Sequence, residues 1–262
     1  MRTIDIQDPN SIKIVIFPDG QPHVNISGIE TGDNVKVIAR LRDPMELMLL
    51  LQTSNALSNL RANKEELVIP YLMGARFDRI MSKGDSVDLR IVADMINYCG
   101  FKKVKIFDVH SDTALQLINN SESIDNNILI EQYTKPNSIL ICPDAGAAKK
   151  VYKIINKNIV DIVQCIKTRD LTNRGKITLQ VLQPEKCKDK DCVIIDDLCD
   201  GGGTFLGIAE QITPKSLTLI VSHGIFSKGV DTLKAYFSEI IVSDSYSEVV
   251  NQDFVKVVKL KL

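Results

Sequence analysis

The densest group of chemically useful side chains lies in residues 192–204, which read CVIIDDLCDGGGT. An apolar run, typical of a buried strand, leads into Asp196 and Asp197, and a third carboxylate follows at Asp200. Carboxylates at a strand end can accept hydrogen bonds from sugar hydroxyls or bind a metal ion. The glycines that come next let backbone N–H groups approach a phosphate, and a helix predicted to begin at Gly203 would direct its positive end at the same anion. The pattern therefore predicts a turn that can hold a ribose phosphate.

A structural explanation of this turn must be weighed beside the functional one. Many α/β proteins use a glycine-rich turn only as a tight connection. Here, however, Asp196 and Asp197 stand directly before it. Adjacent carboxylates at a strand end cost stability unless cations or hydrogen-bond donors meet them. We therefore favour a binding site.

Other candidate site residues also follow apolar runs, but each has a plain structural alternative when it is taken alone. Asp-Gly turns are common, neighbouring surface charges pair with one another, a histidine at a strand end is usually hydrogen-bonded, and an aspartate can cap a helix. A charged hairpin between strands is the structural alternative for the segment around Lys167. These residues are Asp19, Gly20, Gln21, Arg76, Phe77, His110, Asp144, Lys167 and Arg169.

The elements that must position these residues alternate between strands and helices. Several apolar runs are rich in valine and isoleucine, which fits strands that are covered on both faces. Strands are expected at 12–17, 35–40, 67–71, 104–109, 139–143, 162–166, 192–198, 217–222 and 239–243, and helices at 44–60, 86–99, 145–158, 203–212 and 229–237. This alternation predicts an α/β protein with mainly parallel sheets. Pro136 and its polar neighbours interrupt the pattern, so we expect two stacked α/β domains, 1–137 and 138–262.

Two local signals fix the ends of expected helices. Asp43 precedes Pro44 and Glu46, an arrangement typical of a helix start. Gly100 follows Cys99 and is expected to end its helix.

Composition and the lengths of the apolar runs argue against several classes of function. The formal net charge of -1 disfavours a nucleic-acid-binding protein, which usually carries a basic excess. No apolar run is long enough to cross a bilayer, and the N-terminal segment has no signal-peptide core. The six scattered cysteines are expected to be buried, reduced thiols and not zinc ligands, which predicts a cytoplasmic location.

Residues 196–204 resemble the phosphoribosyl-pyrophosphate motif of type I phosphoribosyltransferases and of ribose-phosphate pyrophosphokinases. The motif usually has Thr where Gly201 stands, so one hydroxyl contact to phosphate is missing here. Five further segments resemble the pyrophosphokinases alone, namely FPDGQ at 17–21, IPYLMGARFDR at 69–79, FDVHSD at 107–112, CPDAGAAK at 142–149 and IKTR at 166–169. SHGIFS at 222–227 is similar to a stretch near the end of that family's sequences.

The resemblance implies two phosphoribosyltransferase-like, Rossmann-like domains and the reaction of ATP with ribose 5-phosphate to give AMP and 5-phospho-α-D-ribose 1-diphosphate. By resemblance, Asp196, Asp200, Gly201, Gly202, Gly203 and Thr204 bind ribose 5-phosphate, and Asp19, Gly20, Gln21, Arg76 and Phe77 face ATP. His110 and Asp144 would support Mg²⁺, and Lys167 and Arg169 would be catalytic, ahead of a loop at 170–176. The resemblance also implies a homo-oligomer, a dimer or a hexamer.

Two alternatives remain. A type I phosphoribosyltransferase would explain residues 196–204 but not the other segments. A catalytically silent homologue with a regulatory role would explain the departures at Gln21, Phe77 and Gly201, where the family usually has Glu, Gln and Thr. The presence of Lys167 and Arg169 argues against a catalytically silent homologue.

Overall fold

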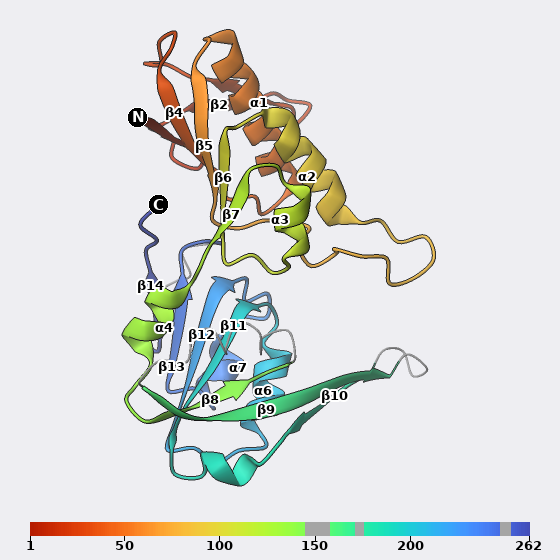
Figure 1. The fold of residues 1–262 in the computed structure, drawn as a ribbon, viewed down its shortest axis with the longest axis vertical. Coiled ribbons are helices and arrows are strands. Elements are labelled where there is room, and N and C mark those ends of the chain that lie inside the picture. The colour runs from red at the N-terminus through yellow and green to blue at the C-terminus, as the bar shows by residue number, and fades with distance from the viewer. Residues whose placement is uncertain (145–157, 171–175, 247–252) are drawn as a thin grey trace. The chain divides into compact units, whose positions relative to one another are not determined.

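The computed structural model describes residues 1–144, 158–170, 176–246 and 253–262 (Figure 1). Their contacts divide the chain into two compact units, Met1–Asp125, joined by Leu262, and Asn126–Lys261. The division falls between Asp125 and Asn126, whereas the sequence led us to expect one after residue 137. The helix expected at 145–158 lies almost entirely outside the described residues.

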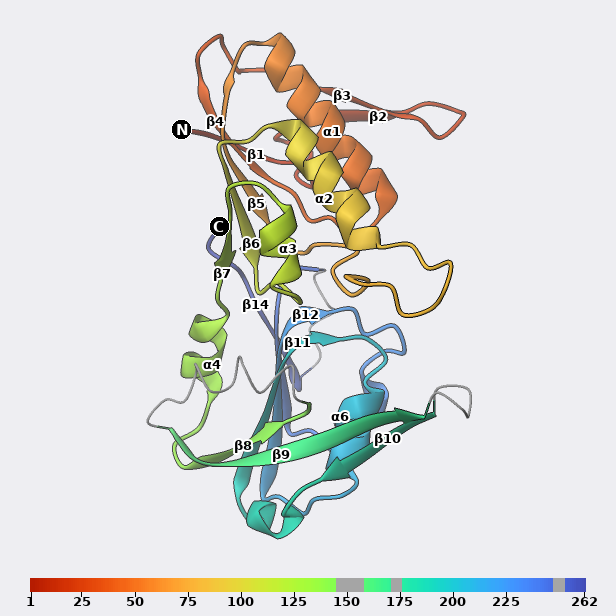
Figure 2. The same ribbon diagram turned by 45° about the vertical axis from the view of Figure 1, so that its right-hand side comes forward.

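The first unit is built on a five-stranded sheet with the order β1-β4-β5-β6-β7. All of its neighbouring strands run parallel. The helices α1, α2 and α3 lie together beside this sheet (Figure 2). Its elements are β1 Arg2–Asp5, β2 Lys13–Ile16, β3 Pro22–Asn25, β4 Asn34–Ile38, α1 Pro44–Asn59, β5 Asn63–Ile69, α2 Asp88–Cys99, β6 Lys103–Phe107, α3 Thr113–Leu117 and β7 Ser121–Ile124.

Local sequence signals set the helix ends, as expected. The Asp43 carboxylate accepts a hydrogen bond of 2.9 Å from the backbone N–H of Glu46, which caps α1. Gly100 adopts the left-handed conformation, with φ of 68°, and ends α2.

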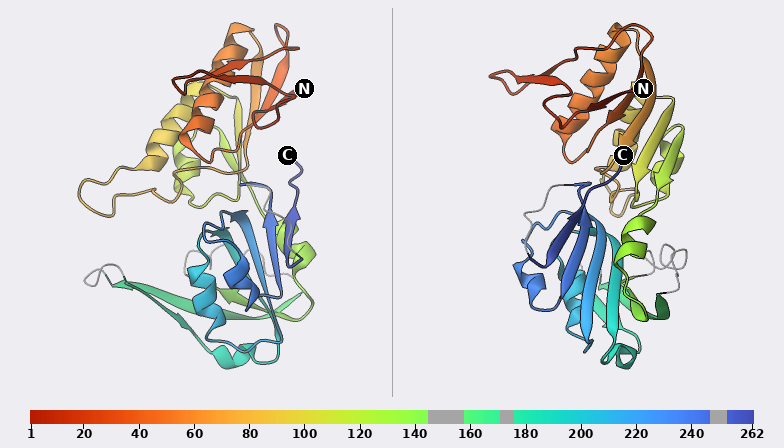
Figure 3. Two further views of the ribbon diagram at one scale, coloured as in Figure 1. Left: turned by 180° about the vertical axis from the view of Figure 1, so that it is seen from behind. Right: turned by 90° about the vertical axis from the view of Figure 1, so that its left-hand side faces the viewer.

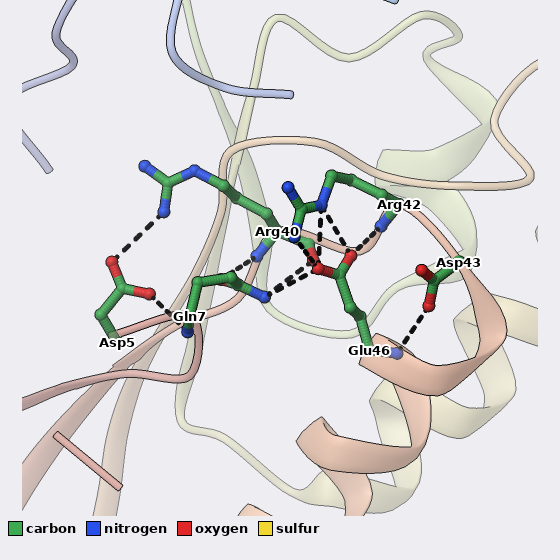
Figure 4. Close-up of polar contacts among 6 residues, drawn as sticks. All are labelled: Asp5, Gln7, Arg40, Arg42, Asp43 and Glu46. Carbon is green, nitrogen blue, oxygen red and sulfur yellow. Dashed lines mark hydrogen bonds and ion pairs between the residues drawn. The ribbon is translucent and has the colours of Figure 1, made fainter. Parts of the chain in front are cut away.

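The start of α1 is held to the carboxyl ends of β1 and β4 by a polar network (Figure 4). Glu46 is buried, with 6% of its surface exposed, and it pairs with the Arg42 guanidinium. The Gln7 side chain donates to the Arg40 carbonyl oxygen at 3.1 Å and to Glu46 at 3.4 Å. Arg40 in turn pairs with Asp5 at 3.2 Å. Because Glu46 is buried and charged, losing its partners would leave an uncompensated charge, so the network fixes this edge of the sheet.

The strand expected at 12–17 forms, but it does not join the sheet. Its central part, β2, pairs only with β3, in an antiparallel hairpin. All four residues of β2 are exposed. The apolar residues there suggested a buried strand, and that expectation is wrong for β2, because β3 is the strand of this hairpin that packs against α1 and contributes Val24 to the core.

The described part of the second unit contains a seven-stranded sheet with the order β10-β9-β8-β11-β12-β13-β14. Only the pair β9–β10 is antiparallel there. Helix α4 lies on one side of β12 and β13, and α7 lies on the other (Figure 3). The elements are α4 Asn127–Tyr133, β8 Ser138–Cys142, β9 Ile159–Asp170, β10 Lys176–Val181, a 3-10 turn at Pro184–Cys187, β11 Asp191–Cys199, α6 Gly203–Ala209, β12 Ser216–Gly224, α7 Asp231–Lys234, β13 Glu239–Ser243 and β14 Val255–Val258.

The predicted α/β class with mainly parallel sheets is confirmed. All six cysteines are buried and carry free thiols. Within the described ranges, no helix is long and apolar enough to cross a membrane.

Candidate functional site

Three acidic residues of the second unit, Asp196, Asp197 and Asp200, lie at the carboxyl end of β11, in the middle of the sheet. β11 runs parallel to β8 and β12, which lie on either side of it. Asp197 is buried, with 7% of its surface exposed, whereas Asp196 and Asp200 are partly exposed. The backbone N–H of Asp197 donates to an oxygen of the Asp196 carboxylate at 2.9 Å. Ligands of open α/β sheets bind at this edge, so the predicted sugar-binding residues stand where a ligand is expected.

Electrostatics around Asp196 also indicate a place prepared for a ligand. Burial raises the pKa of Asp196 well above its ordinary value, and the negative charges of Asp197 and Asp144 raise it further. Asp144 follows β8, the neighbour of β11, so the charges of three carboxylates act together at one sheet edge. Carboxylates grouped in this way are stabilised by cations and by hydrogen-bond donors. A metal ion or sugar hydroxyls are therefore ligands that this edge of the sheet suits.

The glycine turn between β11 and α6 needs glycine at its second position. Gly202 has φ of +75°, a conformation that other residues rarely adopt. A Cβ atom at this residue would also lie 3.1 Å from Cδ2 of Leu233 in α7. Helix α6 then begins at Gly203, and Thr204 is partly exposed in its first turn. The turn therefore packs closely against α7 at Gly202 while Gly203 remains exposed.

The side chain of Lys167 extends from β9 to the glycine turn between β11 and α6. It lies on β9, and its ammonium donates a hydrogen bond of 3.2 Å to the Thr204 hydroxyl. A predicted catalytic residue and a predicted phosphate-binding residue thus meet. The Arg169 side chain lies outside the described residues, although its backbone pairs with Ile177 in β10. The hairpin considered as a structural alternative exists, and most of the loop expected at 170–176 lies outside the described residues.

The nucleotide-facing candidates of the first unit occupy two separate places. Asp19, Gly20 and Gln21 form the exposed tip of the β2–β3 hairpin, where the Gln21 backbone N–H donates to Asp19 at 3.0 Å. Arg76 and Phe77 lie in the loop between β5 and α2. Phe77 is 59% exposed, so its ring is available for stacking.

The loop of Arg76 is tied to the loop of His110. The Ser111 hydroxyl donates to the Asp78 carboxylate at 2.7 Å, and these loops follow β5 and β6, which are parallel neighbours. His110 itself is exposed. The structure therefore brings Arg76, Phe77 and His110 to the carboxyl edge of one sheet.

The hydrogen bond between Asp78 and Ser111, which joins the two loops, can be tested through the pKa of Asp78. Hydrogen bonds from Arg79 and Ser111 lower the pKa of Asp78 from 3.8 to about 2. Its carboxylate therefore stabilises the fold above its unfolded pKa, and this contribution is lost as the pH falls through about 2. Asp78→Asn is expected to lower the free energy of unfolding at pH 7 by about 1 kcal/mol, because Arg79 is mostly exposed and its pairing is screened.

Urea unfolding at pH 7 and at pH 3 measures this effect. The loss caused by Asp78→Asn should be smaller at pH 3, and Asp94→Asn on the exposed face of α2 is the matched control. An equal loss at both pH values would contradict the role of the charged carboxylate.

Carboxylates are suitable ligands for a magnesium ion, but the described residues do not form a complete coordination shell. Among the residues that the structure describes, no group of three histidine, cysteine or acidic side chains could hold a metal ion. Magnesium is usually bound through one or two carboxylates together with substrate phosphates and water, and the acidic end of β11 suits that arrangement. His110 belongs to the first unit and Asp144 to the second.

One residue beside the site was missed by sequence reasoning. Lys228 follows the segment 222–227, and its side chain lies against Gly201. No spacing pattern marks it, because the contact depends on how the loop after β12 folds back.

Comparisons with known proteins are consistent throughout. Residues 6–100 match the model of the N-terminal domain of ribose phosphate pyrophosphokinase. The chain is 29% identical over 232 residues to the ribose-phosphate pyrophosphokinase of Aquifex aeolicus, covering 82% of this chain and 71% of that protein. It is 30% identical over 228 residues to the one of Ureaplasma parvum serovar 3, with 82% and 68% covered. A crystal structure of phosphoribosylpyrophosphate synthetase from Mycobacterium smegmatis superposes with a TM-score of 0.82 at 20% identity, covering 99% of this chain and 95% of that one, and so has the same fold.

Proposed function

The chain belongs to the ribose-phosphate pyrophosphokinase family, and from this premise we propose that it transfers the pyrophosphoryl group of ATP to ribose 5-phosphate. The products are AMP and 5-phospho-α-D-ribose 1-diphosphate. The single observation that carries the proposal for this chain is the contact between Lys167 and Thr204 beside the acidic end of β11. It joins a cation suited to reacting phosphates to a turn suited to a ribose phosphate.

In this reaction, the anomeric hydroxyl oxygen of ribose 5-phosphate attacks the β-phosphorus of ATP. The bond from that phosphorus to the α,β-bridging oxygen breaks, AMP leaves with this oxygen, and the hydroxyl proton is released. Phosphoryl transfer of this kind depends on positioning and charge neutralisation more than on covalent help. Asp196 and Asp200 would accept hydrogen bonds from the ribose hydroxyls, and residues 201–204 would hold the 5-phosphate.

The remaining roles are assigned in the same way. Lys167 and Arg169 would stabilise the charge that develops on the transferred phosphates. Phe77 would stack on the adenine ring, and Arg76 would pair with the nucleotide phosphates. Mg²⁺, when bound, neutralises phosphate charge, and Asp144 and His110 are its proposed protein contacts.

We further propose that the chain works as a homo-oligomer, at least a dimer, in the cytoplasm. The exposed tip at Asp19–Gln21 would then complete the ATP site of a neighbouring subunit. Light scattering of the purified protein measures the mass directly, and a monomer at assay concentrations would overturn this assignment.

The experiment that tests the reaction is a separation of nucleotides after incubation with ATP and magnesium, with and without ribose 5-phosphate. AMP that forms only with ribose 5-phosphate is the expected result. A properly folded protein that yields no AMP, with manganese tried in place of magnesium, would favour the catalytically silent alternative, and consumption of phosphoribosyl pyrophosphate with a nucleobase would favour a transferase.

A further inference from the structure

The space beside Gly201 is filled by a lysine side chain. A Cβ atom at residue 201 would lie 3.3 Å from both Cδ and Cε of Lys228 and 3.5 Å from its Cγ. The stem of Lys228 therefore runs along the first glycine of the turn, where a larger residue would have its side chain. The absence of a side chain at residue 201 thus lets the Lys228 stem lie close to the turn.

The backbone that carries Lys228 is anchored to the strand that carries the acidic residues. The N–H groups of Ile225 and Phe226 both donate to the carbonyl oxygen of Cys199, at 2.9 and 3.1 Å. The Gly229 N–H then donates to the Phe226 carbonyl oxygen at 2.8 Å. Cys199 is the last residue of β11, directly before Asp200 and Gly201. The loop at 225–229 is therefore fixed to the start of the turn, and Lys228 extends from a defined place.

The charge of Lys228 has no partner within the part of the chain that the structure describes. Its side chain is exposed, and no described carboxylate forms an ion pair with its ammonium. At the other end of the turn, the ammonium of Lys167 contacts Thr204. Two lysine side chains thus flank residues 201–204. A phosphate monoester between them would gain charge-assisted hydrogen bonds, which are about twice as strong as neutral ones.

We propose that Lys228 binds the 5-phosphate of ribose 5-phosphate in this chain and takes the place of the threonine hydroxyl that is missing at Gly201. The proposal rests on the proposed function, because that function supplies the ligand. It also gives a physical reason for the departure at residue 201. A threonine there would crowd the Lys228 stem, which would have to shift away from residue 201 to make room.

The test is calorimetric titration of ribose 5-phosphate into the full-length protein without ATP, which needs no turnover. Lys228→Met keeps most of the stem and removes the charge. It should weaken binding about 10- to 100-fold, the usual value of a hydrogen bond to a charged group, whereas Lys228→Arg should retain most of the affinity. Lys190→Met, an exposed lysine before the amino end of β11, is the matched control and should bind as the parent does.

Two further arms identify the group that is bound. Lys228→Met should not change the affinity for ribose. It should lower the affinity for inorganic phosphate if Lys228 contacts only the phosphate group. Gly201→Thr should weaken binding of ribose 5-phosphate, and the double variant Gly201→Thr with Lys228→Gly should recover much of it, because the hydroxyl then replaces the lysine.

Either of two results would overturn the proposal: affinity of Lys228→Met for ribose 5-phosphate within twofold of the parent, or no binding by the parent protein itself. Failure of the proposed function would look different. In that case the parent would bind ribose 5-phosphate, and depend on Lys228 to do so, but would form no AMP.

Discussion

Replacing Lys167 with alanine is expected to lower kcat by a factor of about 10² to 10³, the range seen when one group that stabilises developing charge is removed. Its ammonium stands at the Thr204 hydroxyl, at the edge of the proposed phosphate turn. The interaction that matters would be with phosphate oxygens whose charge grows during the reaction. Since the contact to a neutral hydroxyl contributes only about 1 kcal/mol, binding of ribose 5-phosphate should change little.

Steady-state kinetics combined with the calorimetric titration separates the two effects. Thr168→Ala is the matched control, because Thr168 is the next residue along β9 and side chains of a strand alternate between its faces. A loss in kcat of less than tenfold, with Thr168→Ala unaffected, would remove Lys167 from the catalytic residues. Lys167→Ala and Lys228→Met should therefore differ in kind, the first in turnover and the second in binding.

Asp196→Asn is expected to abolish most of the activity and at the same time to stabilise the protein. Burial and the charges of Asp197 and Asp144 raise the pKa of Asp196. A raised carboxyl pKa means that the folded state loses stability as the pH rises through it. Asparagine removes this charge and can still accept the hydrogen bond from the Asp197 backbone N–H.

The gain should be about 1 kcal/mol at neutral pH, or a rise in Tm of a few degrees. It should shrink toward pH 4, where the carboxyl is protonated in the folded chain and about half protonated in the unfolded chain. At neutral pH, kcat/KM of Asp196→Asn should be at least about 100-fold lower than that of the parent if Asp196 binds the ribose hydroxyls.

The opposite end of the same strand supplies the control. Asp191 begins β11, and its pKa is lowered by a hydrogen bond from Ser216 and by Lys215 and Lys135. Asp191→Asn should therefore lower Tm at neutral pH and leave activity unchanged. If Asp196→Asn were less stable than the parent at neutral pH, the unfavourable gathering of carboxylates at this edge would be refuted.

Sequence reasoning worked best where chemistry is local. The buried strand before Asp196, the glycine turn after it, the cap at Asp43 and the stop at Gly100 all depend on neighbouring residues, and all appear as expected. The strands β1 (RTID) and β7 (SESI) were missed, because each has four residues of which only one is apolar, too few for an apolar run or a period to be recognised.

The features that sequence reasoning missed depend on tertiary contacts. The apolar residues of β2 predicted a buried strand, but β2 lies outside the five-stranded sheet and pairs only with β3. The position of Lys228 depends on the return of its loop to Cys199, and the tie between Asp78 and Ser111 joins residues far apart in sequence. Neither contact can be recognised from the local sequence pattern. The main site residues could therefore be predicted from the sequence, but Lys228 and the contact between Asp78 and Ser111 could not.

The most direct test of the account uses ATP labelled in its γ-phosphate, together with magnesium and ribose 5-phosphate. The label should pass into phosphoribosyl pyrophosphate, with one equivalent of unlabelled AMP formed for each equivalent of labelled product. That result requires the pyrophosphoryl group to move as a unit to the sugar. Label that appears in free phosphate or pyrophosphate, or that stays in ATP, would contradict the proposed reaction.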